Sequence, residues 1–143
     1  MLSNLIYLPA QPLISLVGAG GKTTTMYTLA RELARAGQRV VTTTTTQIFR
    51  PTSDETEQLI IEEKPSLLLD MVKASLQQHR HVTIAGSINE RSKLMSVPPD
   101  VPALLLRQVS DDTRRADSKT GSGACQSARE HMHPVCSPRP STR

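Results

Sequence analysis

The residues best suited to chemistry lie in one glycine-rich stretch near the N-terminus. Glycines let a backbone adopt unusual dihedral angles and approach a ligand closely. The N–H groups of such a turn, together with the positive end of a following helix, attract an anion. Lys22 can reach terminal phosphates, and the Thr23 hydroxyl can bind Mg²⁺. The stretch therefore predicts a phosphate-binding loop made of Gly18, Ala19, Gly20, Gly21, Lys22, Thr23 and Thr24.

One position departs from the usual phosphate-loop pattern G-x-x-x-x-G-K-[ST]. Leu16 stands where that pattern has its first glycine. The alternative interpretation is a glycine-rich turn between a strand and a helix, with a solvated lysine. The neighbouring sequence favours the phosphate loop, because the apolar run Leu13–Val17 is typical of a strand buried on both faces.

A helix is predicted after the loop, from about Thr23 to Ala36. Its apolar residues recur on one face, and Gly37 predicts the end of the helix. The members of this apolar stripe are Met26, Leu29, Ala30, Leu33 and Ala34. Gln38–Thr43 then predicts a second strand. A strand, a helix and a second strand in this order predict a right-handed crossover and a parallel sheet.

Five consecutive threonines, Thr42–Thr46, end the second predicted strand. Threonine favours strands, so one interpretation is that the strand simply continues. In open parallel sheets, however, ligands bind beyond the carboxyl ends of the strands. We therefore expect Thr43, Thr44 and Thr45 to include contacts to phosphate or to a second substrate.

The following region predicts a second helix from Leu67 to about Gln78 and a third strand over Val82–Ala85, ended by Gly86. A polar loop over Ser87–Ser96 and a short helix around Leu104–Leu106 come next. The acidic residues on both sides of Leu59–Ile61 are interpreted as a solvated face. His79 and His81 are expected at the surface.

Composition limits the classes of protein. The 143 residues suffice for one domain, and their net charge of +4 contains no basic run of the kind that binds nucleic acid. No apolar run approaches the ~20 residues of a membrane helix. The N-terminus lacks the features of a secretory signal. The sequence thus predicts a cytoplasmic protein that contacts neither nucleic acid nor membrane.

The stretch LISLVGAGGKTTTMYTLARELARAGQRVVTTTTTQIF resembles the opening of the selenium-dependent hydroxylase accessory proteins, the YqeC family. The later SKLMSVPPD is similar to that family's Lys-Leu…Pro-Pro segment. The resemblance implies an α/β, P-loop NTPase-like fold of three layers with a parallel sheet. It also implies binding of ATP or GTP through Gly18–Thr23, with Mg²⁺ on Thr23. The implied partner is a molybdenum hydroxylase or its cofactor-maturation machinery.

ATP is favoured over GTP because the chain lacks an [NT]KxD motif that would read guanine. We find no catalytic residue. Hydrolysis needs an acidic metal partner and a positioned water, and Asp54 and Glu55 are weak candidates for these roles. Enzymatic turnover is therefore left open. The Gly-Lys-Thr-Thr-Thr run also resembles the ATP site of Mur-type ligases, but those enzymes need two further domains for which this chain is too short.

The sequence changes character near residue 110, and we predict a partial nucleotide-binding domain over 1–110. Residues 111–143 contain no Leu, Ile or Phe, which is a composition typical of disorder. The related family continues at this point with an apolar strand ending in Val-Glu-Ala-Asp-Gly. The tail is therefore either a flexible segment or, as we favour, an aberrant frameshifted one. In the second case the chain is a truncated, non-catalytic fragment with an incomplete sheet.

Overall fold

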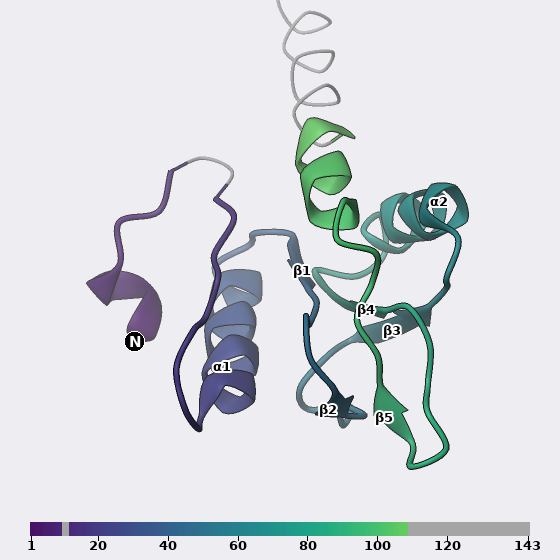
Figure 1. Cartoon of the computed structure of the whole chain (residues 1–143). Coiled ribbons are helices and arrows are strands. Elements are labelled where there is room, and N and C mark those ends of the chain that lie inside the picture. The colour runs from purple at the N-terminus through teal and green to yellow at the C-terminus, as the bar shows by residue number, and fades with distance from the viewer. Residues whose placement is uncertain (10–11, 109–143) are drawn as a thin grey trace, which may run out of the picture. The chain divides into compact units, whose positions relative to one another are not determined.

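Three parallel strands form the main sheet of the computed structural model, which describes residues 1–9 and 12–108 (Figure 1). Met1–Leu106 make up one compact unit. In chain order the elements are η1 (Leu2–Leu5), α1 (Lys22–Arg35), β1 (Val40–Thr42), β2 (Ile48–Phe49), β3 (Gln58–Ile61), α2 (Pro65–Ser75), β4 (His81–Ala85) and β5 (Lys93–Leu94). Residues 101–108 are helical. The predicted tail, 111–143, lies outside the described residues, and the domain boundary at residue 110 stays a prediction.

The sheet has the order β1-β4-β3, and both pairings are parallel. Val41 lies opposite Val82, and Ile60 lies opposite Ile84. All five residues of the central strand β4 are buried. This is the expected position of a strand with neighbours on both sides and helices on both faces. The predicted mixed α/β fold with a parallel sheet is confirmed.

Alternate residues of β4 face the two helices. Val82 and Ile84 pack in one core cluster with Leu68 and Val72 of α2. Residues of the opposite parity face α1, since Ala85 clusters with Tyr27 and successive side chains of a strand point to opposite faces. The two helices therefore cover opposite faces of the sheet, which agrees with their positions in Figure 1.

Helix α1 agrees with its prediction almost to the residue. Its buried residues include Leu29, Ala30 and Leu33, which belong to the stripe recognised in the sequence. Gly37 has φ 92°, and its N–H donates to the Ala34 carbonyl, so it ends the helix as expected. Helix α2 begins at Pro65 because proline fits the first helical turn, where its missing N–H is not needed.

The predicted strand Leu13–Val17 is not formed, so that prediction is wrong for this structure. Its backbone makes no hydrogen bond to another main-chain group of the described residues. Leu13 is 61% exposed and Val17 is 90% exposed. An apolar run becomes a strand only where a neighbour pairs with its N–H and C=O groups, and β1 pairs only with β4. The predicted strand–helix–strand unit therefore lacks its first strand.

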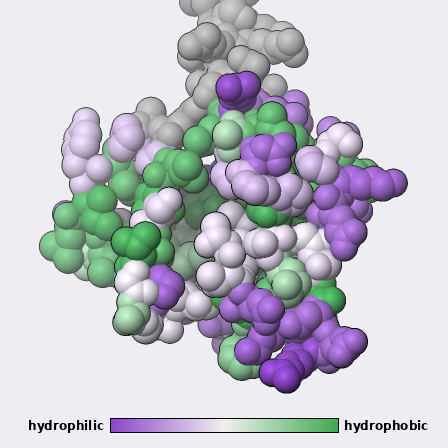
Figure 2. Space-filling model, viewed as in Figure 1, coloured by the Kyte–Doolittle hydropathy of each residue, from purple (hydrophilic) through white to green (hydrophobic). Residues whose placement is uncertain are grey.

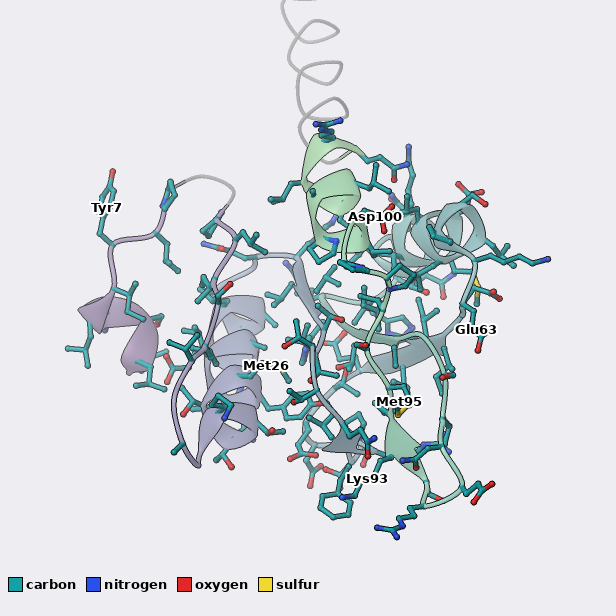
Figure 3. The ribbon with its side chains drawn as sticks, in the orientation of Figure 1. Tyr7, Met26, Glu63, Lys93, Met95 and Asp100 are labelled. Atoms are coloured by element: carbon teal, nitrogen blue, oxygen red, sulfur yellow. The ribbon has the colours of Figure 1, made fainter. Side chains whose placement is uncertain are left out.

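Three strands, β2, β3 and β5, were missed by the sequence interpretation. Gln58–Ile61 forms β3 although acidic residues surround it, and Ile60 is only 3% exposed. Lys93–Leu94, within the predicted polar loop, pairs antiparallel with β2. A strand of two residues is too short to show an alternating pattern. In this pair Lys93 Nζ lies 4.8 Å from the centre of the Phe49 ring (Figure 3).

The N-terminal segment is held to α1 by one carboxylate. The backbone N–H groups of Leu2 and Ser3 donate to the two carboxylate oxygens of Glu32, at 3.1 and 2.8 Å. These bonds, chiefly the one from Ser3, hold the pKa of Glu32 below its ordinary value. Hydrophobic surface is visible over this segment in Figure 2. Leu5, one of its apolar residues, is 82% exposed.

Candidate functional site

The backbone of the glycine-rich loop has positive φ angles, which favour glycine. Gly18, Gly20 and Gly21 have φ angles of 128°, 77° and 73°, a region that other residues rarely adopt. Gly21 is the residue immediately before α1, and no side chain caps this end of the helix. A Cβ added at any of the three would meet nothing within 4 Å. The glycines are therefore needed for the conformation of the loop, and the space beside it is open.

Lys22 folds back over the loop that precedes it. Its Nζ donates to the Gly18 carbonyl oxygen at 2.5 Å, and the residue is exposed. Among the described residues no carboxylate forms an ion pair with this ammonium group. A positive charge is thus held beside the open face of the loop, next to the N-terminus of α1, without an internal counter-charge.

A hollow of about 270 Å³ lies in front of the loop. One wall is the loop and the first turn of α1, and the other is the segment that leads into β2. The lining residues are Gly20, Gly21, Lys22, Thr23, Thr24, Thr46, Gln47 and Ile48. The structure thus brings the glycine loop and the end of the threonine run together. Of the predicted site residues, Gly18 and Ala19 belong to the loop but do not line this hollow.

The threonine run contributes a different member from those selected in the sequence. Thr43, Thr44 and Thr45 do not line the hollow, whereas Thr46 does. Thr44 Oγ1 donates to the Thr46 carbonyl at 2.7 Å and accepts from the Thr46 N–H at 3.1 Å. This local turn occupies Thr44 and positions Thr46. The Thr43 hydroxyl is buried and has no hydrogen-bond partner in the part of the chain that the structure describes.

Gln47 was missed by sequence reasoning. Asn89 Nδ2 donates to Gln47 Oε1 at 3.2 Å. Asn89 Oδ1 in turn accepts from the backbone N–H groups of Arg91 and Lys93, at 3.0 and 2.9 Å. The turn before β5 therefore fixes one wall of the hollow. The available signal was a polar residue between the threonine run and the apolar Ile48.

Acidic residues lie elsewhere. Within residues 1–9 and 12–108 no carboxylate lines the hollow beside the glycine loop. Asp54 and Glu55, the weak candidates for a metal partner, line a separate cleft with Arg31 and Arg35. In the described part of the chain no group of three or more His, Cys, Asp or Glu side chains is placed to hold a metal ion.

A buried row of polar side chains crosses the sheet on its α1 face. His81 Nε2 lies 3.0 Å from Thr42 Oγ1, which lies 2.8 Å from Thr83 Oγ1. His81 is 3% exposed, so its predicted surface position is wrong. Burial lowers the pKa of His81 below its ordinary value of 6.5, and the Glu57 charge and the Glu55 main chain offset part of this effect. The ring is therefore neutral at pH 7.

No helix in the described ranges is long and apolar enough to cross a membrane.

Comparison with known sequences decides the family. The sequence model of the family described as YqeC protein matches residues 14–114, which include the glycine loop and every strand of the sheet. The chain belongs to the YqeC family.

One curated relative within the YqeC family is the uncharacterized protein YqeC of Escherichia coli strain K12, which is 58% identical over 40 residues. The matched segment covers 28% of this chain and 16% of that relative, so only a small part of the relative's length is represented. No solved structure matches this YqeC-family chain.

Proposed function

We propose that this YqeC-family chain binds a nucleoside triphosphate, ATP in preference to GTP, together with Mg²⁺. The observation that carries the proposal is the open hollow beside three positive-φ glycines, with Lys22 at its edge and no carboxylate of the described residues paired with it. Three features of the loop suit a phosphate group. These are a glycine backbone with open space beside it, a positive helix end and a cation without a counter-charge.

Each residue of the loop has a distinct proposed role. The backbone N–H groups of Gly20, Gly21, Lys22 and Thr23, which line the hollow, donate to phosphate oxygens. Contacts from Gly18 and Ala19, which do not line it, stay a prediction. Lys22 exchanges its bond with the Gly18 carbonyl for a charge-assisted bond to a terminal phosphate. The Thr23 hydroxyl, on the first turn of α1, is the Mg²⁺ ligand, and Thr24 contacts the α-phosphate side. When bound, Mg²⁺ would supply charge neutralisation at the phosphates.

The opposite wall is proposed to contact the remainder of the ligand. Thr46 and Gln47 present a hydroxyl and an amide across the hollow from Lys22. They replace Thr43, Thr44 and Thr45 as the contacts proposed from this segment. Binding without hydrolysis is the activity that we assign to the described residues, because a hydrolytic site needs an acidic metal partner and none lines the hollow.

The biological role proposed for this site follows from the family resemblance. The chain would act as an accessory protein in the maturation of selenium- or molybdenum-dependent hydroxylases, in the cytoplasm. Its partner would be such a hydroxylase or its cofactor-maturation machinery. Hydroxylase activity in cells lacking the gene, complemented with the chain or with its Lys22→Ala variant, tests this role. Rescue by the variant to the level of the natural sequence would overturn a nucleotide-dependent role.

A second candidate is a chain that folds only in part and binds nothing. The unpaired run at Leu13–Val17 favours this candidate, since the loop follows directly from it and two of its apolar side chains are exposed. Thermal unfolding separates the two candidates. A cooperative transition whose midpoint rises with Mg²⁺ and ATP supports binding. A non-cooperative transition, or a cooperative one unchanged by millimolar nucleotide, contradicts it.

A further inference from the structure

A second hollow, of about 380 Å³, has no part in the proposed function. It lies between the C-terminal half of α1, the segment 53–57 and the start of β4. The glycine loop lies at the other end of α1, since it precedes the first residue of that helix. Its charged lining residues are Arg31, Arg35, Arg80, Asp54, Glu55 and Glu57.

Opposite charges face this cleft without neutralising one another. Among the described residues no ion pair joins its arginines to its carboxylates, and the guanidinium groups of Arg31 and Arg35 have no hydrogen-bond partner. They are four positions apart on α1, which places both guanidinium groups on one face of the helix. Two free cationic groups therefore stand side by side on one wall of the cleft.

Two of the three carboxylates of the opposite wall, Glu55 and Glu57, are held in place by main-chain groups. Glu55 Oε2 accepts from the Thr52 N–H at 2.9 Å. Glu57 Oε2 accepts from the Arg80 N–H at 2.8 Å. Each bond engages one oxygen and orients the carboxylate, while the second oxygen can accept another donor. The Arg80 side chain is also held, since its Nη1 donates to the Gly37 carbonyl at 2.6 Å.

We propose that this cleft binds a small zwitterion with a carboxylate at one end and an ammonium group at the other, such as an amino acid or a short peptide. The carboxylate would lie against Arg31 and Arg35, because guanidinium groups pair with carboxylates through two parallel hydrogen bonds. The ammonium would lie against Asp54 and Glu55. A ligand with only a negative charge would be repelled by the carboxylates of the cleft. A ligand with only a positive charge would be repelled by its arginines.

The test is titration of the ¹⁵N-labelled full chain with glycine, diglycine and triglycine, followed by amide chemical shifts. These probes differ in the distance between their charged ends. We expect at least one probe to change the amide chemical shifts of residues 53–57 and 80–81 saturably. Its dissociation constant should lie in about the millimolar range typical of exposed ion pairs. Its N-acetyl analogue lacks the ammonium and its C-terminal amide lacks the carboxylate. Each should bind about tenfold more weakly or worse.

Matched variants locate the binding. The double substitution Arg31→Gln and Arg35→Gln should weaken the same probe about tenfold or more, and Asp54→Asn should weaken it too. Arg39→Gln, which removes an exposed arginine outside the cleft, should leave it unchanged. The proposal is overturned by an N-acetyl analogue that binds as well as its parent, or by binding unaffected in the double variant. Absence of saturable shifts with all three probes up to about 50 mM would also overturn it.

Discussion

The ring of His81 and the hydroxyl of Thr42 lie 3.0 Å apart across two parallel strands, and both residues are buried. Thr42 is also bonded to Thr83, its register partner on β4. One threonine hydroxyl thus serves two buried polar groups. We therefore expect the stability of the sheet to depend on pH and on this one hydroxyl group.

Stability should fall as the pH is lowered through the ordinary pKa of histidine. Because burial lowers the pKa of His81 below 6.5, the unfolded chain binds a proton more readily than the folded chain. The corresponding stability is fully present above 6.5 and is lost progressively at lower pH. Urea unfolding measured between about pH 7.5 and pH 5 checks this expectation. His81→Gln should flatten the dependence in this window and His79→Gln should not, whereas equal slopes in all three proteins would refute the assignment.

Thr42→Val should destabilise the fold by about 1–3 kcal/mol, since it leaves His81 and Thr83 each without a bonded hydroxyl in a buried setting. Thr43→Val is the matched control. Its hydroxyl is buried and unbonded among the described residues, so its removal should be neutral or slightly stabilising. Chemical denaturation of both variants gives the comparison. Equal losses of stability would show that the Thr42 bonds contribute nothing particular.

Gly21→Ala should weaken nucleotide binding about tenfold or more and cost about 1–2 kcal/mol of stability, because alanine is strained at φ 73°. Gly37→Ala imposes a similar strain, at φ 92°, far from the hollow. It should lower stability to a similar extent and leave nucleotide affinity unchanged. Affinity and unfolding measured on both variants separate the two effects. A loss of affinity in Gly37→Ala equal to that in Gly21→Ala would contradict a local role for the loop.

Gly86→Ala should destabilise the chain by about 1–3 kcal/mol, because the new Cβ would lie 2.5 Å from the Ser96 carbonyl oxygen. The backbone after β4 is held there by a bond from the Gly86 N–H to Met95. The shift of the unfolding midpoint measures the cost. An unchanged midpoint would mean that the segment from Met95 to Val97 packs less closely on β4 than the structure shows.

Much of the fold was predictable because it depends on local periodicity. Helix α1, its end at Gly37 and the position of α2 follow from apolar spacing and from glycine and proline. The predictions that were wrong concern the pairing of strands. Leu13–Val17 has the composition of a central strand, but a strand also needs a partner, which lies outside its own sequence. The β5 pairing with β2 involves two residues on each side, too few to leave a pattern.

The part of the candidate site that one continuous segment forms was predictable from the sequence. The loop from Gly20 to Thr24 lines the hollow, whereas the opposite wall depends on how the threonine run turns. Thr44 bonds to Thr46 within the run, and Asn89 fixes Gln47 from a distant segment. His81 was misjudged because its strand begins one residue earlier than predicted. Its alternation with Thr83 could have indicated a buried position on the α1 face.

The central claim is that the glycine loop binds nucleotide, and fluorescent-nucleotide titration of the purified chain with and without Mg²⁺ tests it most directly. The natural chain should bind saturably and more tightly with Mg²⁺. Lys22→Ala should lose at least about tenfold in affinity through the missing phosphate contact. Lys64→Ala, which removes an exposed lysine before α2, should retain the nucleotide affinity of the natural chain. A cooperatively folded chain that binds no nucleotide, or that binds equally well as Lys22→Ala, would contradict the claim.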